Sequence, residues 1–201
     1  MGEAAVGEEG ADPRSEVRRR DRVKEEEWVR AFLTRASHGF LATVDEHGQP
    51  FLNSNLFVFD EAERCIYVHT HRTGRTRSNL DKSDKVAFGV AAIGRLLPAP
   101  TALEFSVEYA GATVFGRGRV VTDPEECRAA LQKLLGKYAP HLVPDRDYRA
   151  TTDAELERTA VYRIDIETWS GKQKAAPPDF AGAFVVPEPP VPFAPDRPLA
   201  G

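Results

Sequence analysis

The chain has 201 residues, a formal net charge of −4 at pH 7 and an isoelectric point near 5.8. This mild acidity disfavours binding to nucleic acid or to an anionic membrane, and no run of about 20 apolar residues or secretory signal is visible. Two cysteines, Cys65 and Cys127, have neither metal-binding nor redox spacing, so we expect a reduced, cytoplasmic protein.

Composition divides the chain into three parts. Residues 1–20 contain almost no large apolar side chains and are expected to be a flexible N-terminal tail. Residues 21–176 are expected to form one folded domain. Residues 177–201 hold eight of the fifteen prolines and are expected to be an extended C-terminal tail.

The spacing of apolar residues alternates between helical and strand periods. Val23, Trp28 and Phe32 predict a helix over 21–36, ended by Gly39 as a left-handed cap. Period-two segments separated by turn residues predict strands over 40–45, 51–59, 65–70, 85–93, 103–109, 112–121 and 160–168. Further helices are predicted over 74–82, 123–138 and 152–158. The pattern indicates a mainly β (α+β) fold: six or seven antiparallel strands in a small barrel with a few packed helices.

Glycines mark special positions in the strands that follow residue 100. A kink or bulge is expected at 110–111, between two strands. Gly116 and Gly118 lie on the same face of the next strand, where missing side chains permit sharp coiling or the close approach of another backbone.

The third predicted strand and the helix after it carry the most chemical information. Residues two apart on a strand share a face, so Tyr67, His69 and His71 are expected to point together. The helix that begins near Gly74 offers free N–H groups, and Arg75 adds a planar cation, which together make a phosphate pocket plausible. The competing interpretation is an ordinary solvated helix face.

The histidines and the segment after the last strand have alternative interpretations. His69 and His71 form half of a metal site, but no third ligand has matching spacing, so no metal is expected. A histidine here can also be an axial haem ligand or a hydrogen-bonded barrel residue. Trp169 and Lys172 can bracket a flat phosphorylated ligand, or Trp169 can simply close one end of the barrel.

Taken together, these segments resemble a known family. The order and spacing of residues 39–45, 48–50, 66–75, 93–98, 103–109, 114–120 and 158–172 are similar to those of the pyridoxamine-phosphate-oxidase-like flavin-binding proteins. Within that superfamily, the chain most resembles the nitroimidazole-resistance (nitroimidazole reductase) branch. The likeness covers residues 20–176.

The resemblance implies a six-stranded antiparallel split β-barrel and a homodimer with FMN in clefts at the subunit interface. His69 would lie beside the flavin as a proton donor or substrate-orienting group. The implied cofactor-binding residues are Asn53, Ser54, Asn55, Leu56, Val68, His69, Thr70, Arg75, Arg77, Trp169 and Lys172. One departure is Ser54-Asn55, which stands where a Pro-Leu pair is usual and changes the polarity over the ring.

The implied function is that of an FMN-dependent oxidoreductase that uses a small-molecule substrate and an electron donor, with nitroaromatic compounds as a candidate substrate class. The alternative is a haem-binding or non-catalytic barrel. Oxidation of pyridoxamine phosphate itself is not expected, because the family's second, arginine-rich phosphate site would fall where this chain has Ala175-Ala176-Pro177-Pro178.

Overall fold

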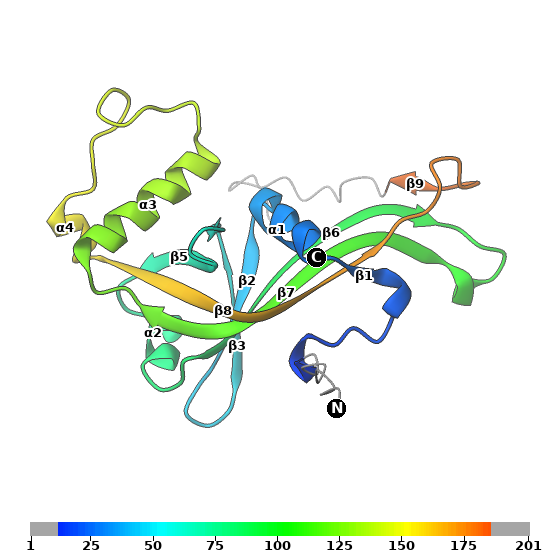
Figure 1. Ribbon diagram of the computed structural model, residues 1–201, viewed down its shortest axis with the longest axis horizontal. Helices are drawn as coiled ribbons and strands as arrows, with labels where there is room; N and C mark the ends of the chain where they lie inside the picture. Colours follow the sequence, from blue (N-terminus) through cyan, green and yellow to red (C-terminus); the bar gives the residue numbers. More distant parts are fainter. Residues whose placement is uncertain (1–11, 186–201) are drawn as a thin grey trace, which may run out of the picture. The chain divides into compact units, whose positions relative to one another are not determined.

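The computed structural model describes residues 12–185 (Figure 1). These residues divide into two compact units, one formed by 12–91 with 111–172 and the other by 92–110 with 173–185. The predicted tails lie mostly outside the described residues. Of their described parts, residues 12–20 contain the short 3-10 turn Pro13–Ser15 and the start of a second turn, Arg20–Arg22.

Strands dominate the described chain and belong to one sheet. The strands are β1 (Val23–Lys24), β2 (Gly39–Val44), β3 (Pro50–Asn55), β4 (Phe57–Asp60), β5 (Cys65–His71), β6 (Lys85–Leu97), β7 (Ser106–Val120), β8 (Thr159–Lys174) and β9 (Phe184–Val185). The helices are α1 (Glu26–Arg35), α2 (Arg75–Leu80), α3 (Pro124–Tyr138) and α4 (Asp153–Leu156), and a 3-10 turn covers Ala102–Glu104.

The sheet has the order β3-β2-β6-β7-β8-β5-β4, so its two end strands are consecutive in the chain. Only Leu56 separates β3 from β4, and the single strand predicted over 51–59 is therefore interrupted at that residue. With β3 and β4 taken as one interrupted strand, the path contains the six expected strands. The predicted split β-barrel class is confirmed.

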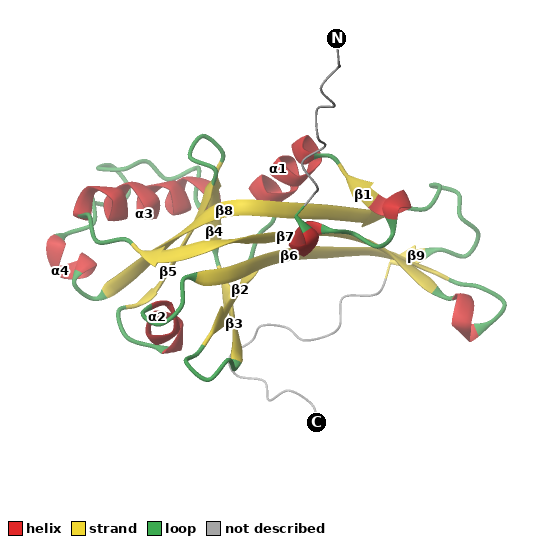
Figure 2. Ribbon diagram, turned by 60° about the horizontal axis from the view of Figure 1, so that its bottom comes forward, coloured by secondary structure: helices red, strands yellow, loops and turns green. Residues whose placement is uncertain are grey.

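The core of the first unit is a cluster of buried apolar side chains from its strands and from α1. Leu41, Phe57, Phe88 and Tyr162 are fully buried there. Helices α1 and α3 lie on one side of the long strands and α2 lies on the other (Figure 2). Burial of Tyr162, Ile164 and Ile166 confirms the predicted inward face of β8. Val161 points the other way and is also buried, because it packs in the cluster that includes residues of α3.

The start and end of α1 differ from the prediction. The helix begins only at Glu26, because Val23 and Lys24 pair with Lys172 and Gly171 of β8. The predicted cap at Gly39 is wrong, since Gly39 is the first residue of β2 and has no positive φ. A Cβ on Gly39 would lie 2.3 Å from the ring of Phe88, so this position requires glycine for packing.

The strands that follow α2 are longer than predicted. β6 continues to Leu97 and β8 to Lys174. β7 runs unbroken from Ser106 to Val120, where two strands with a bulge between them were predicted. Leu103, expected in a strand, lies in the 3-10 turn instead.

In the second unit, one arginine holds the end of the described chain. The Arg95 guanidinium donates to the Glu108 carboxylate at 2.8 and 2.9 Å and to the backbone carbonyls of Ala176, Pro177 and Pro178. The Ala176 N–H donates in turn to Glu108, and these contacts lower the pKa of Glu108 to about 2. The Pro-rich segment is thus ordered at its start, and it contributes β9, which pairs with β6.

Helix α3 is fastened to the strands by charged groups. Asp123 caps it as predicted, accepting hydrogen bonds from the backbone of residues 125 and 126. Glu126 accepts a hydrogen bond from the Tyr67 hydroxyl at 3.0 Å, and Lys133 forms an ion pair with Asp60. The Lys137 ammonium has no hydrogen-bond partner in the part of the chain that the structure describes, and lies 3.7 Å from the centre of the Phe57 ring.

Burial lowers the pKa of Lys137 from 10.5 to about 8. Because the unfolded chain keeps the ordinary value, it binds more protons than the folded chain between these two pH values, and the free energy of unfolding rises with pH across that window. We expect Lys137→Met to remove this rise and to increase the free energy of unfolding at pH 7 by about 1–2 kcal/mol, after allowance for partial exposure. Urea unfolding at pH 7 and pH 10 measures both effects. An unchanged pH dependence in the variant would contradict this assignment.

Gly116 fulfils the predicted role of allowing two backbones to approach. A Cβ there would lie 2.1 Å from the Asp165 carbonyl oxygen of β8, whereas a Cβ on Gly118 would meet the side chains of Leu80 and Val86. A backbone carbonyl within a paired strand cannot move aside cheaply.

We therefore expect Gly116→Ala to lower the free energy of unfolding by about 3 kcal/mol. Gly136 of α3 is the matched control, because nothing lies within 4 Å of the place its Cβ would occupy. Gly136→Ala is expected to raise the free energy of unfolding by roughly 0.5–1 kcal/mol. Chemical denaturation of the two variants should give shifts of opposite sign.

Candidate functional site

His69 lies where two paired strands separate. β4 pairs with β5 from Phe57 opposite Val68, and one further step would set Leu56 against His69. At that step the chain leaves β5, and β3 pairs with β2 instead. The interruption of the strand thus frees one edge of β5 beside His69.

The hydroxyl of Tyr138 holds this interruption in place. It accepts a hydrogen bond from the Phe57 N–H at 3.0 Å and lies 2.9 Å from the Phe57 carbonyl and 2.8 Å from the Ser37 carbonyl, to either of which it can donate. Burial raises the pKa of Tyr138, so the hydroxyl keeps its proton. The last turn of α3 is thereby tied to the junction of β3 and β4.

A hollow of about 610 Å³ opens between α3, the 139–151 loop and β5. Its lining residues are Leu56, His69, Leu131, Leu134, Leu135, Tyr138, Tyr148, Arg149, Thr151, Glu155 and Thr159. His69 keeps an exposed edge, yet burial of the ring lowers its pKa, so the imidazole is neutral at pH 7. Within residues 12–185, no hydrogen bond to its ring nitrogens is formed.

The charges at the rim of this hollow are paired with each other. The Arg149 guanidinium donates to both Glu155 carboxylate oxygens, at 2.9 and 2.8 Å. This pairing, together with hydrogen bonds from the N–H and hydroxyl of Thr152, lowers the pKa of Glu155 to about 2. At neutral pH the Arg149 guanidinium and the Glu155 carboxylate are therefore paired with each other.

A second group of predicted residues gathers where β3 meets α2. The Asn53 amide donates to the Thr76 hydroxyl at 3.3 Å, and the Asn55 amide donates to the Asn53 carbonyl at 2.7 Å. Arg75, the first residue of α2, lies over the Phe51 ring at 5.3 Å, and no described carboxylate is within ion-pair distance of it. Arg77 differs, because it is paired with Asp81 at 3.0 Å.

The remaining predicted residues of β5 and β3 are less available for contact with a cofactor. The Val68 side chain is fully buried, and its backbone is paired on both sides with β4 and β8. The Thr70 hydroxyl lies 3.1 Å from that of Tyr162. Ser54 is exposed on β3. His71 hydrogen bonds to the Thr73 hydroxyl and lines one hollow together with His69, as the shared face predicts.

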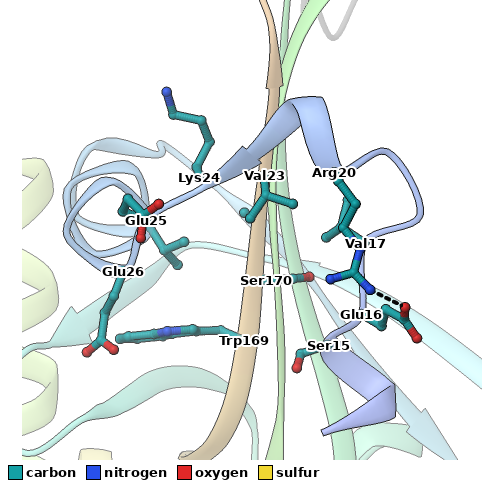
Figure 3. A pocket seen from close by; sticks show the side chains of 12 residues that line it. Ser15, Glu16, Val17, Arg20, Val23, Lys24, Glu25, Glu26, Trp169 and Ser170 are labelled. Atoms are coloured by element: carbon teal, nitrogen blue, oxygen red, sulfur yellow. Dashed lines mark hydrogen bonds and ion pairs between the residues drawn. The ribbon is translucent and has the colours of Figure 1, made fainter. Parts of the chain in front are cut away.

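Trp169 lies in a different part of the first unit. The guanidinium groups of Arg64 and Arg30 lie 4.3 and 5.2 Å from the centre of its ring, which lines a hollow of about 550 Å³ beside α1 (Figure 3). His69 is opposite Val161 on β8, and eight residues at ~3.3 Å each place Trp169 about 26 Å farther along that strand. Lys172 lies beyond it, paired with Val23. One chain therefore does not bring these residues to His69.

Several residues of the hollow at His69 were not among the predicted site residues. Leu131, Leu135 and Tyr138 recur at helical spacing on α3 and form a stripe separate from the buried one of Cys127, Ala130 and Leu134. That double stripe is visible in the sequence, and it signals a helix with two apolar faces. Nothing in the sequence around Arg149 indicates that it belongs to a site.

Between residues 12 and 185, no cluster of three or more His, Cys, Asp or Glu side chains has the geometry to hold a metal ion. No helix in the same range is long and apolar enough to cross a membrane.

Residues 25–173 match the family model described as pyridoxamine 5'-phosphate oxidase. The chain belongs to this family. No curated protein sequence matches it significantly.

Solved structures similar to this family member share its fold at low sequence identity. The flavocytochrome Anf3 from Azotobacter vinelandii is 23% identical, with 94% of each chain covered and a TM-score of 0.73. The FAD and heme binding protein from Mycobacterium smegmatis is 23% identical, with 88% of this chain and 92% of that one covered and a TM-score of 0.68. A candidate 5-nitroimidazole antibiotic resistance protein from Bacteroides thetaiotaomicron is 18% identical, with 75% and 86% covered and a TM-score of 0.63.

The Tyr138 hydroxyl provides a test of how the site is held. We expect Tyr138→Phe to lower the free energy of unfolding by about 1–3 kcal/mol, because the buried N–H of Phe57 loses its partner. Tyr148→Phe is the control, since the Tyr148 hydroxyl accepts only from the exposed Gln132 amide and its loss should cost under about 1 kcal/mol. Guanidinium unfolding compares the two. Equal losses would mean that the hydroxyl does not fasten the junction.

Proposed function

We propose that this protein binds FMN and acts as a flavin-dependent oxidoreductase. The observation that carries the proposal is the joining of two predicted segments, 53–56 and 68–77, through the hydrogen bond between Asn53 and Thr76. This corner presents amide groups and the unpaired guanidinium of Arg75. A planar guanidinium without a carboxylate partner suits a phosphate monoester, and amides suit the polar edge of a flavin ring. The residues present therefore fit the cofactor.

The bound flavin would supply two-electron chemistry, and the chain would supply binding and orientation. Arg75 holds the phosphate. His69, with a neutral imidazole and no hydrogen bond inside the described chain, orients a small-molecule substrate through a hydrogen bond from its ring N–H. Nitroaromatic compounds are candidate electron acceptors, supported by the likeness to the Bacteroides thetaiotaomicron protein, and a nicotinamide is a candidate electron donor.

A homodimer is part of the proposal. Trp169 and Lys172 belong to the family-like motif, yet they lie about 26 Å along β8 from the position opposite His69. A second copy of the chain can bring its own Trp169 and Lys172 to a flavin held near Arg75 and His69, whereas a single copy cannot.

Haem binding is the second candidate function. It is supported by the two similar structures described as a flavocytochrome and as an FAD and heme binding protein. It is also supported by His69, whose neutral ring nitrogens are free in the described chain and face a largely apolar hollow, as an axial ligand requires.

The absorption spectrum of the purified protein, before and after addition of FMN or haem, tests both candidates. We expect flavin bands, no Soret band, and release of FMN on denaturation. Arg75→Ala should weaken FMN binding by at least about tenfold through loss of a charged phosphate contact. Arg146→Ala is the matched control, since Arg146 is exposed and paired only with its neighbour Asp147.

His69→Ala separates binding from turnover. It should keep FMN but slow nitroaromatic reduction by about 10²-fold, because the substrate loses the hydrogen bond that orients it. A protein that takes up no flavin, or one that forms a Soret band lost in His69→Ala, would replace the flavin proposal with the alternatives.

A further inference from the structure

The hollow at His69 has a lining whose chemistry restricts what it can bind. Its α3 wall consists of Leu131, Leu134, Leu135 and Tyr138, and Leu56 faces it from the strand junction. Leu56 is 52% exposed and Leu135 is 39% exposed, so both keep apolar surface uncovered by the chain itself. Burial of such surface by a ligand is favourable.

The polar groups of the hollow carry no net charge at neutral pH. Arg149 and Glu155 neutralise each other through two short hydrogen bonds, and the low pKa of Glu155 keeps that pair intact well below pH 7. The His69 imidazole is neutral for the reason given above. An anionic ligand would lose its hydration, and to gain a cation it would have to displace Glu155 from Arg149.

Several polar groups of the lining remain able to hydrogen bond to a neutral ligand, and His69 and Tyr148 are two of them. The His69 ring nitrogens have no partner in the described chain. The Tyr148 hydroxyl accepts from the Gln132 amide at 2.7 Å, which leaves its own proton available for donation. A pocket with apolar walls and a few such groups selects a ring compound with a polar substituent, and about 610 Å³ is in the usual range for small-molecule sites.

We propose that the hollow between α3 and His69 binds uncharged, mainly apolar ring compounds that carry one hydrogen-bonding group, and that it excludes phosphorylated or carboxylated ones. The proposal rests on the proposed function only in naming this compound class as the substrate; the binding itself needs no flavin. It sets the hollow apart from the corner at Arg75, where an unpaired cation suits a phosphate.

The test compares two ligands of nearly the same shape, 2-acetylnaphthalene and 2-naphthoate, by calorimetric titration of the full-length protein. Neither is reducible under these conditions, so binding is measured without turnover. We expect the neutral ketone to bind at least about tenfold more tightly than the carboxylate. The measurement is made with and without saturating FMN, and flavin content is read by absorbance in the same samples.

Leu135→Gln and Leu103→Gln form the matched pair of variants. Leu135 lines the hollow, whereas Leu103 is 95% exposed in the 3-10 turn of the second unit. Leu135→Gln should weaken binding of the ketone about tenfold, and Leu103→Gln should leave it unchanged. Thermal unfolding checks that both variants are folded.

Several outcomes would overturn the proposal. They are equal or tighter binding of naphthoate, no binding of either ligand, or equal effects of the two variants. Dissociation of a dimer by Leu135→Gln with no change in ligand affinity would show that a second copy covers the hollow. Flavin binding without the ketone preference defeats this inference alone, whereas the ketone preference in a protein that takes up no flavin defeats the proposed function alone.

Discussion

The structure depends on one hydroxyl group at the point where a strand is interrupted. Closing a sheet whose end strands are consecutive requires the chain to leave one neighbour and join another within a single residue, here Leu56. Such a step leaves backbone groups without ladder partners, and an unpaired buried N–H is costly. Tyr138 supplies the missing partner for Phe57 from a helix 81 residues later in the chain.

Because that helix fastens the junction, α3 has two tasks on two faces. One face packs on the sheet through Ala130 and Leu134, and the charges of Glu126 and Lys133 fix its position. The other face, with Leu131 and Leu135, lies beside His69, and Leu135 there remains 39% exposed. The same docking that closes the barrel therefore also builds an apolar wall next to the histidine. Barrel closure and the candidate site share one physical cause.

Much of the fold follows from local patterns in the sequence. The two-residue period of Tyr162, Ile164 and Ile166 identifies β8, and Asp123 with the following proline identifies the start of α3. Gly39 shows where local reasoning fails. Its sequence context suits a helix cap, but its structural role comes from the Phe88 ring on a strand that pairs with β2. Only the sheet register reveals that neighbour.

The candidate site was predictable to a smaller degree, again for a physical reason. Arg75 and His69 stand out because a cation at a helix start and an imidazole on a strand have chemistry of their own. Each can bind a ligand only if no other side chain of the protein already pairs with it. Such partners can lie far away in the sequence. Arg77, two residues from Arg75, looks equivalent in sequence but is neutralised by Asp81. The place of Arg149 in the site could not be predicted, because it depends on Glu155 and on the α3 residues that surround it.

The grip of Arg95 on the C-terminal segment has a consequence for how the chain is made. Arg95 precedes Ala176, the first of the three residues whose carbonyls it binds, by 81 positions. A ribosome releases those carbonyls at least 81 residues after Arg95, and contacts across so long a separation form late. Until then, Arg95 can pair with Glu108 but not with the carbonyls of residues 176–178. The second unit should consequently become ordered only after residues 176–178 have left the ribosome.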